Sequence, residues 1–149
     1  MITNPDRLLK GVPPITVQHY KLLLVEHFLL KPLAEVFDFT ITSAYRTLNR
    51  QANLTDASGN TVPETKKAKG VSQHCMGEAV DIDGRHNRRM YMWLLEHARP
   101  WQLILYLEEG KTSGLHISIP SENEAIQQKT LLNVDGDWQW YRGEFPAEE

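Results

Sequence analysis

The sequence is poor in cysteine, in long apolar runs and in basic residues at its N-terminus. Cys75 is the single cysteine, so no disulfide can form within the chain and an oxidising compartment is not required. No apolar run approaches the roughly 18 residues that span a bilayer. The first residues also lack the basic segment and apolar stretch of a secretory signal. We therefore expect a chain that folds in a cytoplasm and has no membrane partner.

The charge balance is weakly acidic and excludes a second group of functions. The formal net charge is −3, which gives no general attraction to nucleic acid, to anionic lipids or to an anionic bacterial wall. The apolar and charged fractions, 41% and 23%, are ordinary for a globular protein. A length of 149 residues fits one domain, 1–149, whose core needs no disulfides.

Two stretches have the apolar spacing of helices. Between Ile15 and Phe37 the apolar residues recur every three or four positions, and Pro32 inside this stretch predicts a kink or a new helix. The stretch from Asn87 to His97 repeats the pattern and predicts a second packing helix that ends near Pro100.

The strands are predicted from runs rich in β-branched and aromatic residues. Val80 and Ile82 alternate with polar residues and should face the core. Residues 108–114 read as a hairpin connection, and the alternating aromatic residues of the tail predict a last hairpin. The predicted strands are 39–43, 79–83, 102–107 and 115–119.

Two other segments complete the pattern. Ser121 and Glu124 form a capping-box pattern that predicts a short helix after Pro120. Residues 53–69 are polar and read as a long surface loop. The order of elements predicts an α+β fold, a small antiparallel sheet flanked by helices.

Residues 72–81 carry the chemistry. His74 in a turn and Asp81 on the following strand can converge if Gly77 lets the chain fold back between them. His116 on a neighbouring strand is the natural third donor. Two imidazoles and a carboxylate suit zinc and leave a fourth position for water, as in catalytic sites. On spacing alone, ordinary polar turn residues remain the alternative.

The same stretch resembles the zinc D-Ala-D-Ala carboxypeptidases, which share their fold with hedgehog signalling domains. The residues of this chain match all five defined positions of the pattern Ser-x-His-x-x-Gly-x-Ala-x-Asp. The strand that ends in Ser-x-Tyr-Arg at 43–46 and the strand 115–118 are similar as well. The resemblance runs from about residue 16 to 119, is closest to a phage-type branch, and leaves a C-terminal helix and hairpin as additions. It implies a peptidase-like fold and a Zn²⁺ site of His74, Asp81 and His116.

The resemblance also implies substrate contacts. Arg46 would bind a peptide carboxylate or a developing oxyanion, and Ser72 and Gln73 would line the same cleft. An ordinary surface arginine and a turn-capping serine are the alternatives. Tyr106 is neutral near pH 7, so it would donate a hydrogen bond and would not act as a base.

The general base is out of its usual place. Many relatives of this type carry an acidic residue three positions before the last histidine, where this chain has Ser113. The phage-type branch carries a glutamate on the preceding strand, at the position of Tyr106. Glu108 shares a strand face with Tyr106 and is therefore the candidate base, whereas Glu109 should point away. A solvated hairpin tip is the alternative for both glutamates.

The resemblance implies a zinc metallopeptidase that hydrolyses bonds next to D-alanine in the stem peptide of peptidoglycan. The expected setting is the cytoplasm of a phage-infected bacterium or a phage virion. The alternative is a non-catalytic phage structural or binding protein that keeps the fold and whose partners are other phage structural proteins. The displaced base and the acidic charge favour this alternative, while the complete ligand set and Arg46 favour the enzyme.

Overall fold

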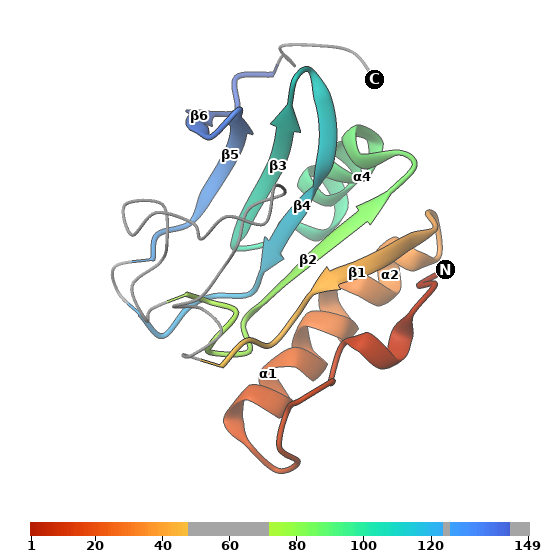
Figure 1. Cartoon of the computed structure of the whole chain (residues 1–149), viewed down its shortest axis with the longest axis vertical. Helices are drawn as coiled ribbons and strands as arrows, with labels where there is room; N and C mark the ends of the chain where they lie inside the picture. Colours follow the sequence, from red (N-terminus) through yellow and green to blue (C-terminus); the bar gives the residue numbers. More distant parts are fainter. Residues whose placement is uncertain (48–71, 124–125, 144–149) are drawn as a thin grey trace.

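The computed structural model describes residues 1–47, 72–123 and 126–143. The surface-loop prediction for residues 53–69 and the position of Glu124 lie outside these residues. Within them, a mixed α+β arrangement is confirmed, with helices packed against a six-stranded sheet (Figure 1).

The first helical stretch is continuous but changes its hydrogen bonding twice. After the short 3₁₀ turn η1 (Pro5–Arg7), α1 (Val17–Val25) leads into one turn of i→i+5 bonding, η2 (Glu26–Leu30), and then into α2 (Lys31–Ala34). Thr16 caps α1, because its hydroxyl accepts the His19 N–H at 3.2 Å. Pro32 lies in the first turn of α2, where a missing N–H is tolerated. The hydrogen bonding changes near this proline, but the helical backbone continues through Leu30 and Lys31, so a separate helix does not begin there.

The second helical stretch matches its prediction. It consists of α4 (Asn87–Trp93) and the i→i+5 turn η4 (Leu94–Ala98). Arg99 ends it in the left-handed conformation, with a φ of 50°, and Pro100 follows.

The sheet has the order β1-β2-β4-β3-β5-β6. Neighbouring strands are antiparallel except for β3 and β5, which run parallel. The strands are β1 (Phe39–Ser43), β2 (Ala79–Gly84), β3 (Gln102–Glu108), β4 (Lys111–Ser118), β5 (Lys129–Val134) and β6 (Asp137–Trp140).

The parallel pair corrects the expectation of an antiparallel sheet. Both Ser118 at the end of β4 and Lys129 at the start of β5 pair with Gln102 at the start of β3. After β4 the chain therefore passes the start of β3 and begins β5 beside it, so β3 and β5 share a direction.

The same crossing replaces the predicted short helix after Pro120. Residues 121–123 and 126–128 hold no helix. The Ser121 hydroxyl accepts the Asn123 N–H at 3.0 Å, a local turn contact. The capping-box prediction is wrong for these residues, because the chain here connects two strands on either side of β3.

Both hairpin turns are short. The predicted connection 108–114 shrinks to Glu109 and Gly110, whose φ angles are 51° and 76°. The last hairpin is confirmed and turns at Asp135 and Gly136, with φ of 49° and 90°. Positive φ at both turn residues suits the twist of two antiparallel strands.

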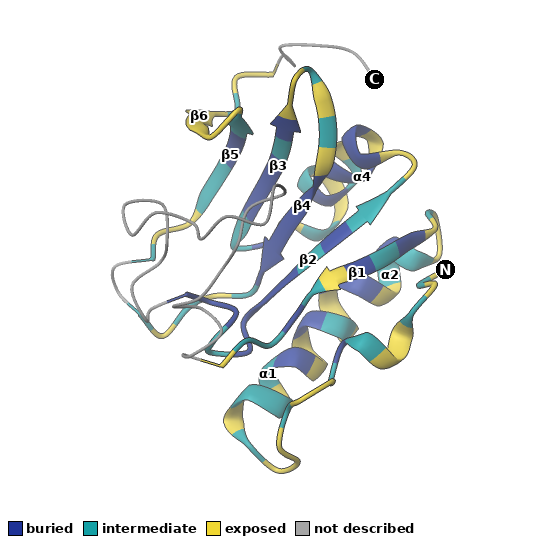
Figure 2. Ribbon diagram, viewed as in Figure 1, coloured by how far each residue is buried: buried dark blue, intermediate teal, exposed yellow. Residues whose placement is uncertain are grey.

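Among the described residues, helices cover one face of the sheet. Val80 and Ile82 are fully buried, as predicted, in a core shared with the leucines of the helices. Figure 2 shows this burial along β2, β3 and β4. Side chains alternate along a strand, so the residues between them face the other side of the sheet. We call this other side the open face, and it carries Asp81, His116, Ile104 and Tyr106.

Candidate metal centre

A tight turn at residues 72–78 brings His74 back over the sheet. The His74 N–H donates to the Ser72 hydroxyl at 3.3 Å, and the Cys75 N–H donates to the Ser72 carbonyl at 3.0 Å. Gly77 has a φ of 69°, and a Cβ built on it would lie 2.6 Å from the Gln18 carbonyl oxygen. Only glycine fits both restrictions, so the fold-back that the sequence analysis required of Gly77 is present.

Three donor atoms converge where this turn meets β2 and β4. Asp81 and His116 are directly paired across the two strands. Asp81 Oδ1 lies 3.2 Å from His74 Nε2 and 3.0 Å from His116 Nδ1. The three donor atoms all lie within 4.8 Å of one another, and both histidines are buried. A group of this size can hold a metal ion.

The hydrogen bond behind His74 fixes which ring nitrogen faces the site. His74 Nδ1 lies 2.8 Å from the Ala44 carbonyl oxygen, which can only accept, so Nδ1 carries the proton. Burial lowers the pKa of His74 and outweighs the attraction of Asp81, so the ring is neutral near pH 7. Nε2 then points a lone pair at Asp81 Oδ1, and a cation between the two atoms would remove their repulsion.

Asp81 and His116 fit the same cation. Burial would raise the pKa of Asp81, but the hydrogen bond from the His116 ring holds it below its usual range. Asp81 is therefore an anion. His116 Nε2 is buried without a hydrogen-bond partner among the described residues, so this ring is oriented by its Nδ1 side. Two imidazole nitrogens and one carboxylate oxygen form a donor set that suits zinc.

Arg46 reaches the site through the ligand carboxylate. Its Nη2 lies 3.4 Å from Asp81 Oδ2, and its Nε donates to the Ser43 hydroxyl at 3.1 Å. The Arg46 N–H also donates to the His74 carbonyl at 3.2 Å. Arg46 thus occupies one oxygen of Asp81, while the other oxygen faces the two histidines.

Ser72 and Gln73 lie beside the site but are turned into the structure. The Ser72 hydroxyl caps the ligand turn, which is the alternative that the sequence left open. Gln73 is buried, and its Nε2 donates to the Ile119 carbonyl at 3.1 Å. Among the described residues, neither side chain forms a hydrogen bond with His74 Nε2 or with His116.

Glu78 is a supporting residue that the sequence analysis missed. It is fully buried, and its Oε2 lies 2.8 Å from Lys21 Nζ. Lys21 also lies 3.0 Å from Glu122 Oε2. Burial would lower the pKa of Lys21, but hydrogen bonds to these glutamates raise it, so the amine stays charged. This ion pair links the ligand turn to α1. In the sequence, the one hint of this role is that Glu78 is an acidic residue between the small residues Gly77 and Ala79.

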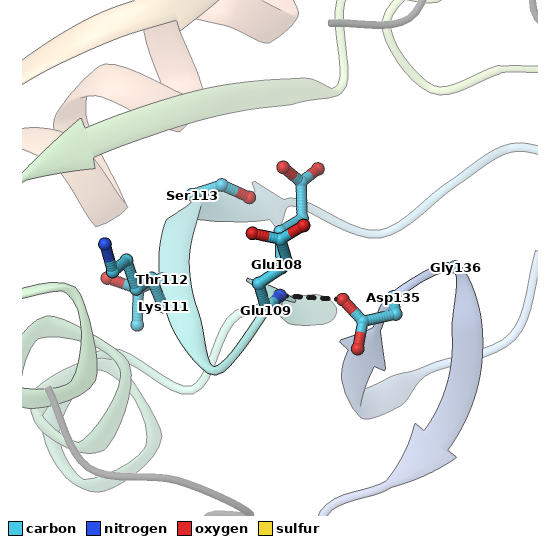
Figure 3. Close-up of a pocket in the computed structure, with 7 residues that line it drawn as sticks. All are labelled: Glu108, Glu109, Lys111, Thr112, Ser113, Asp135 and Gly136. Atoms are coloured by element: carbon cyan, nitrogen blue, oxygen red, sulfur yellow. Dashed lines mark hydrogen bonds between the residues drawn. The ribbon is translucent and has the colours of Figure 1, made fainter.

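Tyr106 and Glu108 lie on the open face as predicted, at different distances from the triad. Burial and the Asp81 charge raise the pKa of Tyr106, so its phenol stays protonated. Glu108 is exposed, four residues along β3 from Ile104, which pairs with His116. That separation is roughly 13 Å of strand. Glu108 lines a surface pocket with Glu109, Ser113 and Asp135, where the Glu109 N–H donates to Asp135 (Figure 3).

The chain matches no family model, no curated protein and no solved structure. In the described residues, no helix is long and apolar enough to cross a membrane.

Proposed function

We propose that this chain is a zinc-dependent peptidase that hydrolyses bonds next to D-alanine in the stem peptide of peptidoglycan. The observation that carries the proposal is the convergence of His74 Nε2, Asp81 Oδ1 and His116 Nδ1 on the open face. A structural zinc site usually has four protein ligands, whereas three protein ligands are typical of catalytic zinc. The motif at residues 72–81 gives the substrate class, and the setting in a phage-infected bacterium follows from the same resemblance.

The metal's part in such a reaction is general chemistry. A zinc ion held by these three residues would polarise a substrate carbonyl and lower the pKa of water beside it. Ala44 and Arg46 hold the ligands His74 and Asp81 in place. Tyr106 keeps its proton and can donate it in a hydrogen bond to an oxygen that gains negative charge.

Glu108 is the general base that we propose from its strand face, and in this structure it lies roughly 13 Å along β3 from the triad, beyond direct hydrogen-bond reach. It lines the same pocket as Ser113, the position at which the resembling peptidases carry their acidic residue. The nearby carboxylates have other roles, because Glu78 binds Lys21 and Asp83 accepts the Asn87 amide at 2.7 Å. Glu108 is exposed and makes no such contact among the described residues.

The second candidate is a non-catalytic phage structural or binding protein. Two observations favour it: Glu108 lies well along β3 from the triad, and Arg46 is bound to Asp81. In this case the zinc site would stabilise the fold, and the partners would be other phage structural proteins.

Turnover separates the two candidates. Zinc-loaded wild type should release D-alanine or cut the neighbouring bond in a D-alanine-terminated wall peptide. Asp81→Asn keeps the size of the side chain and removes the charge that holds the metal, so it should lose both zinc and turnover. Stoichiometric zinc in a wild type that cuts no wall peptide would contradict the peptidase and favour the second candidate.

A further inference from the structure

The open face continues from the metal centre to two exposed tryptophans. Trp138 and Trp140 are each 58% exposed on β6, the edge strand of the sheet. They are two residues apart, so both side chains point to the same face. Of the large apolar side chains exposed in the described residues, these two are the ones that lie on strands.

The strand register places both tryptophans on the open face. Trp140 pairs with Leu131, Leu131 with Ile104, and Ile104 with His116. The His116–Trp140 separation is three strand spacings, about 14 Å. One row of side chains thus runs from the metal ligands to the edge of the sheet.

A neighbouring row links the tryptophans to the site more closely. Trp138 pairs with Asn133, and Asn133 with Tyr106. The Tyr106 and Trp138 rings meet edge to face with their centroids 6.4 Å apart. The charges of Asp81 and Arg46 also act on the Tyr106 phenol, which places this ring between the tryptophans and the metal centre.

The surroundings of the tryptophans indicate what they bind. Lys129 Nζ lies 5.9 Å from the centre of the Trp140 ring, and Asp137 precedes Trp138. Among the described strands, these two rings are the exposed large apolar side chains, so no aliphatic patch extends from them along the sheet. The net charge of −3 and the glutamates of the nearby hairpin disfavour a phosphate polymer. Sugar rings fit best, because each offers an apolar C–H face for stacking and hydroxyls for the polar neighbours.

We propose that Trp138 and Trp140 form a platform that binds the glycan chain of the wall polymer beside the metal centre. The inference rests on the proposed peptidase function, whose substrate is a peptide attached to such a chain. The platform would stack against the sugar rings while the stem peptide crosses β5 and β3 towards His116. It would also supply the wall affinity that the acidic charge of the chain does not give.

The test measures binding of uncharged N-acetylglucosamine oligosaccharides, which carry the sugar rings of the wall glycan without its free carboxylates, to the zinc-loaded full chain by titration calorimetry. Trp140 is the better target, because Trp138 also contacts Tyr106. Trp140→Ala should raise the Kd about tenfold or more, the loss expected of a central aromatic contact. Trp140→Tyr keeps a ring and should recover part of the affinity. Phe28→Ala removes an aromatic residue that is 60% exposed on the helical side and should bind like wild type.

Three results would overturn the platform. The first is that wild type binds no glycan, and the second is that Trp140→Ala leaves the Kd unchanged. The third is that Trp140→Ala changes only the self-association of the chain, measured by sedimentation. The last would make β6 a contact between copies of the chain. Parallel turnover assays separate the two proposals. Glycan binding without turnover of any wall peptide contradicts the peptidase alone, whereas turnover of a D-alanine-terminated peptide without glycan binding contradicts the platform alone.

Discussion

At the residue scale, Asp81 is the side chain that contacts both histidines and Arg46. One of its oxygens lies within 3.2 Å of both histidines, and the other faces Arg46 at 3.4 Å. A partly buried carboxylate with this many partners is costly to place unless its charge is compensated. Because His74 is neutral, Arg46 alone supplies a fixed positive charge at this carboxylate among the contacts described above. A divalent cation would complete the compensation.

Arg46→Ala should lose turnover and keep the fold. The arginine–aspartate contact is long and close to the surface, so its loss should cost about 1–2 kcal/mol of unfolding free energy. Loss of a positive charge that binds a peptide carboxylate or an oxyanion should lower kcat/KM about a hundredfold or more. Thermal melts and turnover of a D-alanine-terminated peptide measure the two effects. Arg89→Ala, an exposed arginine of α4, is the control. A large fall in melting temperature with turnover intact would make Arg46 a structural residue.

The two hairpin glutamates offer a matched test of the base. Glu108→Gln should lower kcat at the low end of the hundred- to ten-thousand-fold range typical of acid–base groups, about a hundredfold. Glu109→Gln should leave kcat unchanged, because Glu109 lies in the turn with a φ of 51° and leaves the alternation of β3. Both changes keep the size of the side chain and remove one charge. Equal losses in both variants, or no loss in either, would rule out Glu108.

At the scale of elements, the ligand turn depends on close packing against α1. Gly77 combines a positive φ with a Gln18 backbone carbonyl that leaves no room for a Cβ. Gly11 has a similar φ of 77°, and a Cβ added to it would meet no atom of the described residues within 4 Å. A substitution at Gly11 therefore tests backbone strain alone, whereas the same substitution at Gly77 tests the strain together with a steric clash.

Gly11→Ala should cost about 1–2 kcal/mol of unfolding free energy from the left-handed conformation alone. Gly77→Ala carries the same strain plus a backbone clash, so it should cost about 3–5 kcal/mol and reduce zinc retention. Denaturant unfolding and metal analysis of both variants measure this. Similar stability and equal zinc in the two variants would mean that the turn does not position His74.

The sequence predicted well those elements whose formation depends on neighbouring residues in the chain. Strand β1 matches its predicted bounds because its residues alternate and are β-branched or aromatic. Two ligands, His74 and Asp81, lie in one short motif, and the third lies on an evident strand. The parallel β3–β5 pair was missed, because pairing between distant segments leaves no local signal. The Ala44 carbonyl behind His74 was missed because a backbone atom is the same in every residue.

Two predictions from local sequence pattern were changed by contacts with distant parts of the chain. The capping-box pattern at Ser121 favoured a helix, but this segment must pass the start of β3 to reach β5. The roles of Ser72 and Gln73 could not be separated from the sequence either, since both side chains are polar in any environment. Their hydrogen bonds in the structure hold the ligand turn.

At the scale of the whole molecule, acid should destabilise the metal-free protein. Burial holds the pKa of His74 below its ordinary value of 6.5, and its neighbours hold that of Asp81 below 3.8. For both groups the unfolded chain binds protons more readily than the folded chain. The unfolding free energy should therefore fall as pH drops below about 6.5, and fall further below about 4.

Chelated protein unfolded in denaturant at a series of pH values would show this slope. Zinc should raise the stability most near neutral pH, and its effect should shrink as acid competes for the histidines. A free energy of unfolding that is flat between pH 7 and 4, with or without zinc, would contradict a buried neutral His74.

The central claim is that His74, Asp81 and His116 bind one zinc ion, and metal analysis of purified protein tests it most directly. Wild type should hold one zinc per chain. His116→Ala should lose most of it, because the chain then offers two ligands. His27→Ala removes an exposed histidine of η2 and should keep the wild-type content. Zinc-free wild type, or full zinc content in a folded His116→Ala, would contradict the claim.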